Sequence, residues 1–272
     1  MNLNKLFRPK KLAIIGGYWA DFVYDENIKI GFKGEMWHIN PKRKSSKKKK
    51  YYKSIADLPS IPDCVYVAVS NDLTIQLMKD ISEIGAGGAV CLASRFSELN
   101  TAEGKEKTKK LISNSGKTPF LGPNCYGFIN FSDNLALWPF SHKGKHCKKG
   151  IALITQSGML SSDIIMATRS LPISFMVSAG NQAVTKIEDL IQYFSKKTNV
   201  SCIAIHIEGI SDLTRFVEAS KFSFYAGKPI IVYKSGKSQI GKRIAKSHTG
   251  SLSGNNEMYS ALFKQLAITE VH

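Results

Sequence analysis

A loop of small residues near position 250 presents a single histidine. It reads Ser-His-Thr-Gly-Ser-Leu-Ser-Gly, with the imidazole on His248 and the next glycine at Gly250. Glycine and serine allow an imidazole to approach a phosphate closely, and a neutral imidazole nitrogen can accept a phosphoryl group. An ordinary surface histidine in a turn is the alternative, and this loop alone favours that simpler interpretation.

A candidate phosphate site lies directly after a predicted strand at Ile151–Thr155. Ser157 and Gly158 follow this strand and open an amphipathic helix. The first amides of a helix have no partner within it, so these amides and the serine hydroxyl could hold a phosphate. A plain serine N-cap explains the same residues, and the motif by itself favours the cap.

A second candidate phosphate site lies at the first predicted strand, Lys11–Gly16, which runs into the Gly16-Gly17 turn. The full G-x-G-x-x-G spacing of dinucleotide sites is missing, and close packing is an equally good reason for two glycines. The next strand ends in Asn40-Pro41-Lys42-Arg43 instead of an acidic residue. Basic residues there suit a phosphorylated ribose, as in NADP or coenzyme A.

A rigid turn, Gly122-Pro123-Asn124-Cys125, follows another apolar strand and carries polar side chains. Cys125 could act as a nucleophile, but no base is near it in the sequence. A small residue packed behind the turn is therefore the favoured interpretation of this cysteine.

Short apolar runs alternate with stretches of helical period, and they do so twice along the chain. This predicts an α/β fold: a Rossmann-like domain at 1–130 and a flavodoxin-like domain at 145–272, joined through an irregular stretch at Asn130–Lys149. The predicted strands are Lys11–Gly16, Glu35–Asn40, Asp63–Ser70, Gly88–Ala93, Thr118–Leu121, Ile151–Thr155, Ile173–Ser178, Val200–Glu208 and Pro229–Lys234. The predicted helices are Leu73–Ile84, Glu103–Ser115, Ser157–Ser170, Ile187–Lys196 and Asp212–Tyr225.

The formal net charge of +17 over 272 residues raises the question of a nucleic-acid partner. Much of the charge lies in one lysine-rich stretch at 42–50, and no nucleic-acid-binding motif accompanies it, so a solvated loop is favoured. No run of about 20 apolar residues and no signal segment is present, which predicts a cytoplasmic protein without a membrane. The five cysteines lack paired spacing, so we expect reduced thiols and no metal site.

Taken in order, these motifs resemble the ADP-forming acyl-CoA synthetases, relatives of the succinyl-CoA synthetase alpha subunit. In the first half the resemblance rests on the strand with its Gly-Gly turn, Asn40-Pro41, Asp57-Leu58-Pro59 and Gly122-Pro123-Asn124-Cys125. In the second half it rests on Ser157-Gly158, Val177-Ser178-Ala179-Gly180-Asn181, Glu208-Gly209, Lys234-Ser235-Gly236 and the His248 loop. It covers nearly the whole chain.

The resemblance implies a ligase that joins a carboxylic acid to coenzyme A while ATP becomes ADP and phosphate, reversibly. His248 would carry the phosphoryl group and Glu208 would orient its imidazole. Ser157, Gly158 and Gly250 would bind phosphate. Coenzyme A would be bound by Gly16, Gly17, Asn40, Lys42, Ser70 and Asn124.

No ATP-binding motif is evident, so the resemblance implies that ATP and Mg²⁺ bind on an ATP-grasp domain or a beta-type subunit, and we expect an oligomer. The sequence predicts the beginning of a further strand at Thr269, and we expect a second domain that is truncated at its C-terminus. Two departures from the family, Arg95 in place of a glycine and Val184 in place of an acidic residue, suggest a subgroup with another acyl substrate.

Three other functions stay open at this point. The chain could be a CoA-dependent regulatory or protein acetyltransferase-type protein, an acyl-CoA-binding scaffold, or an NADP oxidoreductase. Retention of His248 and Glu208 argues against the first, and the histidine loop has no role in the last. The small carboxylic acid or acyl-CoA that serves as substrate does not follow from any motif.

Overall fold

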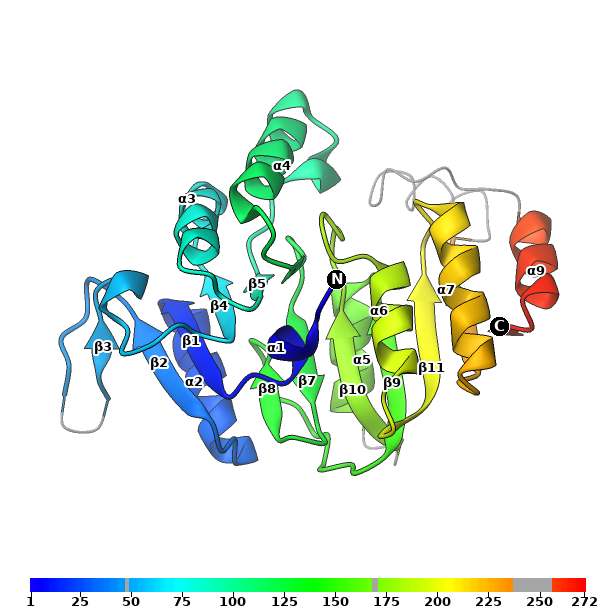
Figure 1. The fold of residues 1–272 in the computed structure, drawn as a ribbon, viewed down its shortest axis with the longest axis horizontal. Coiled ribbons are helices and arrows are strands. Elements are labelled where there is room, and N and C mark those ends of the chain that lie inside the picture. Colours follow the sequence, from blue (N-terminus) through cyan, green and yellow to red (C-terminus); the bar gives the residue numbers. More distant parts are fainter. Residues whose placement is uncertain (47–48, 168–170, 237–255) are drawn as a thin grey trace.

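The computed structural model describes residues 1–46, 49–167, 171–236 and 256–272. Its first sheet is entirely parallel and has the strand order β3-β2-β1-β4-β5-β6 (Figure 1). This is the order of a Rossmann fold, in which the topological switch point lies between β1 and β4. The strands are β1 Lys11–Gly16, β2 Glu35–Ile39, β3 Tyr51–Tyr52, β4 Cys64–Ala68, β5 Ala89–Cys91 and β6 Phe120–Leu121.

Helices cover both faces of the first sheet, which explains why its strands are almost continuously apolar. Helices α3 Asn71–Glu83 and α4 Ala102–Ser115 pack on one face. Helix α2 Tyr18–Ile30 and the short helix α1 Asn4–Phe7 pack on the other. Two 3₁₀ turns, η1 Ile55–Asp57 and η2 Ser97–Leu99, complete this half.

The second sheet has the strand order β13-β12-β11-β9-β10-β7-β8. Its first five strands are parallel, and β7 and β8 extend the sheet in antiparallel fashion. The parallel part has the flavodoxin order, with its switch point between β9 and β11. The strands are β7 Gly127–Asn130, β8 Leu135–Leu137, β9 Gly150–Thr155, β10 Ile173–Ser178, β11 Val200–Ile207, β12 Ile230–Lys234 and β13 Thr269–Val271.

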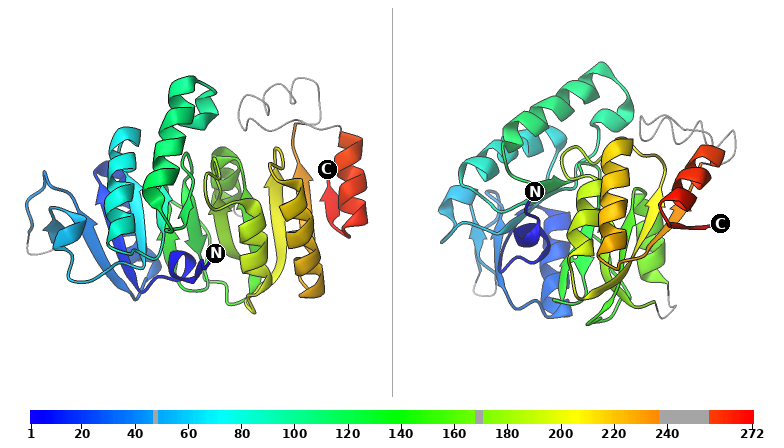
Figure 2. Two further views of the ribbon diagram at one scale, coloured as in Figure 1. Left: turned by 45° about the horizontal axis from the view of Figure 1, so that its top comes forward. Right: turned by 45° about the vertical axis from the view of Figure 1, so that its right-hand side comes forward.

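Helices α6 Ile187–Ser195, α7 Leu213–Tyr225 and α9 Asn256–Gln265 line one face of this second sheet, and α5 Gly158–Met166 lies on the other (Figures 1 and 2). One hydrophobic cluster runs from the α1 and α2 face of the first sheet into the α6 and α7 face of the second. Phe7 is buried at the junction, with its ring centroid 4.7 Å from that of Phe128 and 5.3 Å from that of Phe194. The two sheets therefore share a core.

The predicted fold class is confirmed, and the nine predicted strands and five predicted helices are present with shifts of a few residues at their ends. The stretch 130–149 is not wholly irregular, because it contains β8. Helix α2 and strands β3 and β7 were not predicted. Since β7 pairs with β10 of the second sheet, sheet pairing begins before residue 130, and the domain limits stay a prediction. Within the described ranges, no helix is both long and apolar enough to cross a bilayer.

Candidate functional site

The turn after β1 can exist only with glycine at position 16. Gly16 has φ +140°, and a Cβ there would lie 2.3 Å from the backbone oxygen of Ala68 on β4. The next residue, Gly17, has nothing within 4 Å of the corresponding position. The backbone at Gly16 is therefore packed closely against β4, whereas the backbone at Gly17 has free space beside it at the switch point. This is the geometry that lets a phosphate approach backbone amides.

Helix α2 begins at this turn without a side-chain cap. Gly17 is its N-cap residue, and no side chain accepts a hydrogen bond from the first amides in the described structure. Two predicted binding residues lie at the same edge of the sheet: Ser70 is exposed after β4, and its hydroxyl does not cap α3. Lys42 is exposed after β2. These groups fit an anionic ligand such as the phosphates of coenzyme A.

The Asn40 side chain connects two loops of this site. Its amide nitrogen donates to the carbonyl oxygen of Gly16 over 2.8 Å, and its oxygen accepts from the backbone amide of Lys42 over 3.0 Å. The side chain thus fixes the β1 turn and the β2 loop to each other. We assign it to holding the turn, and contact with a ligand stays a prediction.

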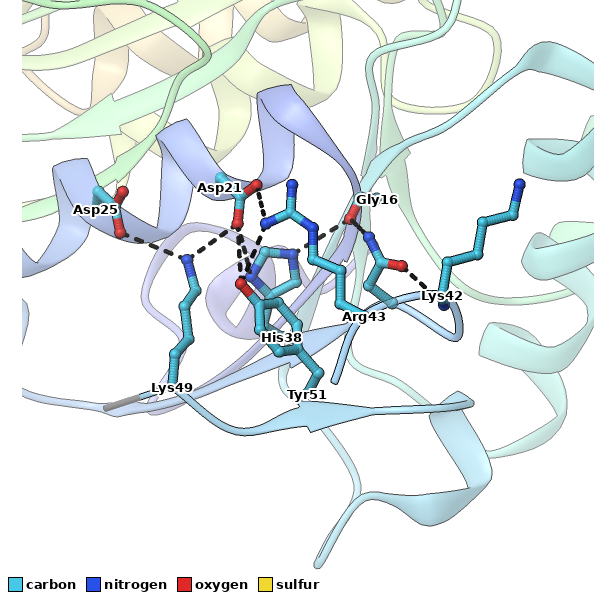
Figure 3. Close-up of polar contacts among 9 residues, drawn as sticks. Gly16, Asp21, Asp25, His38, Lys42, Arg43, Lys49 and Tyr51 are labelled. Atoms are coloured by element: carbon cyan, nitrogen blue, oxygen red, sulfur yellow. Dashed lines mark hydrogen bonds and ion pairs between the residues drawn. The ribbon is translucent and has the colours of Figure 1, made fainter. Parts of the chain in front are cut away.

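A cluster of charged groups surrounds Asp21 in the first turn of α2 (Figure 3). Its carboxylate pairs with Arg43 and, over 3.1 Å, with Lys49. Lys49 is only 18% exposed and lies 4.3 Å from the centre of the Tyr24 ring. The Lys42 side chain points away from this group. Arg43 and Lys49, which were predicted to lie in a solvated loop, are therefore both paired with Asp21.

Electrostatics keep the Asp21 cluster in one protonation state. Partial burial acts to raise the pKa of Asp21, but the hydrogen bond and charge of Lys49 and the charge of Arg43 lower it overall. Burial lowers the pKa of His38, against the effect of its hydrogen bond to the Gly16 carbonyl. His38 is therefore neutral at pH 7. Because its Nε2 lies 3.3 Å from that carbonyl oxygen, its proton belongs on Nε2.

The Gly122–Cys125 turn follows β6 and reaches the second half of the chain. Asn124 has φ +57° and is exposed, and its amide nitrogen lies 3.2 Å from Oδ1 of Asn181, in the loop after β10. Asn181 in turn donates to Glu98 over 2.5 Å. These contacts join the carboxyl edge of the first sheet to that of the second. Asn124 is thus placed between the two predicted sites.

Cys125 is not placed to act as a nucleophile. It is 2% exposed and packs behind the turn, with its sulfur 3.5 Å from the carbonyl oxygen of Cys91. Burial raises the pKa of its thiol to about 12, so no thiolate forms at neutral pH. The packing interpretation of this cysteine is confirmed, and all five cysteines of the chain are free.

The predicted phosphate site opens helix α5 at the switch point of the second sheet. The Ser157 hydroxyl accepts a hydrogen bond from the Leu160 amide over 3.3 Å, so it caps the helix. Gln156 beside it spans to β11: its Oε1 accepts from the amides of Glu208 and Gly209 over 2.5 and 3.2 Å. Its own amide group donates to the Gly209 carbonyl oxygen over 2.9 Å. Gln156 thereby fixes the backbone of Glu208 beside the start of α5, a role that the sequence did not reveal.

A second buried histidine lies two residues before Glu208, at the end of β11. His206 is 6% exposed, its Nε2 lies 3.0 Å from the Ser235 hydroxyl, and its ring stacks on Tyr233. Burial, followed by the nearby charge of Lys234, lowers its pKa to about 4. It is therefore a neutral imidazole that ties β11 to the loop after β12. A polar residue inside an apolar strand was the sequence signal for it.

The structure brings together most of the predicted site residues. Gly16, Gly17, Asn40, Lys42 and Ser70 lie at the carboxyl edge of the first sheet, and Ser157, Gly158 and Glu208 lie at that of the second. His248 and Gly250 fall outside the described residues, so their roles stay predictions. Among the side chains that the structure describes, no group of three or more His, Cys, Asp or Glu could hold a metal ion.

The two residues that depart from the expected family pattern differ in how well they suit their positions. Arg95 has φ +72°, a conformation that favours glycine, so the structure does not explain the arginine. Val184 is half-buried and packs against the core of the first sheet beneath α3 and α4. Neither side chain takes part in the contacts around Ser157 and Glu208.

The fold defines an α/β protein of two sheets, with an open glycine turn at the switch point of the first and a capped helix start at that of the second. Comparison with known families agrees: residues 11–130 match the model of a CoA binding domain, and residues 148–272 match that of a succinyl-CoA ligase-like flavodoxin domain. The chain therefore consists of a CoA binding domain followed by a succinyl-CoA ligase-like flavodoxin domain.

Individual relatives are similar over almost the whole chain. An ADP-forming acetate–CoA ligase of Methanocaldococcus jannaschii is 34% identical over 99% of this chain, which covers 38% of that protein. The alpha subunit of the Pyrococcus furiosus ADP-forming acetate–CoA ligase II is 33% identical over 98% of this chain, which covers 59% of that subunit. Each relative is thus longer than the present chain.

Among solved structures, the dinucleotide forming acetyl-coenzyme A synthetase 1 of Ca. Korarchaeum cryptofilum superposes on 99% of this chain in two forms. Its apo form has a TM-score of 0.90 at 28% identity. Its complex with phosphate and ADP has a TM-score of 0.89 at 29% identity. In both cases this chain covers 59% of the solved chain.

Proposed function

We propose that this chain is the coenzyme A-binding and phosphohistidine-carrying part of an ADP-forming acyl-CoA synthetase. One observation carries the proposal. The open turn at Gly17 and the start of α5 at Ser157 lie at the carboxyl ends of the parallel strands of the two sheets, and the contact between Asn124 and Asn181 joins those edges. A thioester whose CoA phosphates bind at the first edge can present its acyl carbon toward the second.

The residues of this chain then divide the reaction between them. Phosphate at the start of α5 attacks the thioester carbon, which gives an acyl phosphate and releases the CoA thiol. The imidazole of His248 takes the phosphoryl group and releases the carboxylate, and the group then passes to ADP. The α5 amides stabilise phosphate charge, and Glu208 holds the imidazole with one nitrogen free. The reverse sequence makes the thioester at the expense of ATP.

ATP and Mg²⁺ would be supplied by a partner. We assign their binding to an ATP-grasp domain or a beta-type subunit, because the Pyrococcus relative is an alpha subunit and because the two matched domain models are a CoA-binding and a flavodoxin-like domain. An assembly of the two parts would form an oligomer, and a cytoplasmic location suits its substrates. The regulatory alternative has no support among the relatives described above, which are ligases.

The chain's own half of the reaction can be tested without the partner. The purified chain is incubated with acetyl-CoA or phenylacetyl-CoA and labelled inorganic phosphate, and acid-labile, alkali-stable label on protein is measured. We expect label in the wild type, none in His248→Ala, and at least about a tenfold slower rate in Glu208→Gln. His146→Ala, which changes an exposed histidine bonded to Asn134, is the matched control.

A phosphoprotein signal that persists in His248→Ala would contradict the proposal. So would an unlabelled wild type that binds coenzyme A normally, both with these thioesters and with labelled ATP plus an ATP-grasp subunit of a relative. Either result would move the function to CoA binding without phosphoryl transfer.

A further inference from the structure

Three aromatic rings form a row between the two halves of the proposed site. Trp19 is in the first turn of α2, Phe140 lies in the segment after β8, and Tyr126 lies between β6 and β7. The ring centroids are 5.3 Å apart for Trp19 and Phe140 and 4.7 Å apart for Phe140 and Tyr126, both in edge-to-face geometry. No motif of the sequence pointed to this row.

The two ends of the aromatic row lie at the starts of helices α2 and α5. Trp19 is the second residue after Gly17, in the first turn of the helix that begins at the open turn. At the other end, the Tyr126 ring lies against Gly158: a Cβ at Gly158 would be 3.1 Å from a ring carbon. A side chain at position 158 would therefore have to displace the Tyr126 ring by a few tenths of an ångström.

The backbone of Tyr126 holds its end of the row in place. Its amide donates to the Ser178 hydroxyl over 3.3 Å, and its carbonyl oxygen accepts from the Tyr66 hydroxyl over 3.2 Å. Behind it the fully buried ring of Trp138 lies 5.5 Å away. This end of the row is thus a fixed wall, as selective binding requires.

The outer surface of the row is still available to a ligand. Trp19 is 39% exposed, and Phe140 and Tyr126 are half-buried. Trp138, which has no exposed surface, already closes the hydrophobic core behind the row, so packing of the core does not require the three outer rings. The three outer rings extend that cluster along the line that a thioester would follow from the Gly17 turn to Ser157.

We propose that Trp19, Phe140 and Tyr126 form the wall along which the acyl end of the thioester lies, and that this wall selects an aryl carboxylic acid over acetate. The inference rests on the proposed function and names its substrate class. Aromatic faces and edges attract flat aromatic groups beyond the simple burial of area, whereas an acetyl group offers one methyl. A row of three such rings would contribute little to a ligase for acetate.

Binding to the chain alone tests this proposal. Dissociation constants are measured by calorimetry for coenzyme A, acetyl-CoA and phenylacetyl-CoA, and tryptophan fluorescence is followed during each titration. Trp19 dominates a ligand-dependent signal, because Trp37 and Trp138 are 6% and 0% exposed. We expect phenylacetyl-CoA to bind about five- to tenfold tighter than acetyl-CoA and to quench the fluorescence, with the quenching lost in Trp19→Phe.

Substitutions in the row distinguish a direct effect on acyl-group binding from a general loss of stability. Phe140→Leu and Tyr126→Leu keep apolar volume and should bring the ratio of the two dissociation constants to within about twofold of one. Phe222→Leu changes an aromatic residue on α7 whose exposure, 40%, is close to the 39% of Trp19, and it should leave the ratio unchanged. Folding of each variant is checked by coenzyme A binding itself, which does not depend on the acyl group.

The outcomes distinguish this inference from the function beneath it. Equal affinity for acetyl-CoA and phenylacetyl-CoA in a wild type that still labels His248 would overturn the aryl preference alone. A preference that survives both Phe140→Leu and Tyr126→Leu would overturn the wall. Failure to bind any of the three ligands would reject the proposed function together with the inference.

Discussion

The buried imidazole of His206 should make folding stability depend on pH, and His206→Gln should remove that dependence. Its pKa is about 4 in the folded chain against an ordinary value of 6.5, so the unfolded chain takes up this proton more readily. Wild-type stability must therefore fall as the pH drops from about 6.5 towards 4. The difference of about 2.5 pKa units corresponds to a limit of about 3 kcal/mol, of which about 2 kcal/mol is lost between pH 7 and pH 5.

The assay is urea unfolding of wild type and His206→Gln at pH 7, 6 and 5. The free energy of unfolding of the variant relative to wild type should rise by about 2 kcal/mol from pH 7 to pH 5, because other titrations cancel in the difference. Ser235→Ala, which removes the hydrogen-bond partner but keeps the ring, should retain most of the wild-type pH dependence. A variant-to-wild-type difference that is constant over this range would refute the reasoning.

Four further substitutions test the first half of the site. Gly16→Ala should lower the free energy of unfolding by at least about 2 kcal/mol, because its Cβ would lie 2.3 Å from the Ala68 backbone oxygen. Gly17→Ala, which has free space at the same position, should lower it by under about 1 kcal/mol. Thermal or urea unfolding measures both changes. Arg95→Gly should stabilise by about 1 kcal/mol by relieving φ +72°, which urea unfolding would show. Asp21→Asn should cost about 1 kcal/mol, less in high salt, because its two cationic neighbours lose their shared anion.

The α/β class was predictable because alternating strands and helices form parallel sheets with helices on their faces. Helix α2 was missed because its sequence, Tyr18–Ile30, mixes polar and apolar residues without a clear stripe, and the helix is held by contacts with β1 and β8. Strand β3 has two residues and forms because Tyr51 packs its ring 4.9 Å from that of His38. Tertiary contact decides such elements, so local periodicity cannot reveal them.

The site was predictable where backbone geometry demands a residue type. Gly16 and the capping Ser157 were found because glycine and serine follow strands at those positions. The roles of Gln156, His206 and the aromatic row were not found, since they depend on side chains that meet across strands or across the two halves of the chain. The spacing of residues along the sequence does not reveal these tertiary contacts.

The cluster around Asp21 decides which cation of the lysine-rich segment can meet a phosphate. Arg43 and Lys49 both lie against the Asp21 carboxylate, and the lowered pKa of that acid keeps it charged at neutral pH. Lys42 is directed away from this acid, yet the bond from its amide to Asn40 ties it to the Gly16 turn. A phosphate at that turn would gain a new ion pair from Lys42, whereas Arg43 would first have to give up its own. We therefore expect loss of Lys42 to weaken coenzyme A binding more than loss of Arg43, although both carry the same charge.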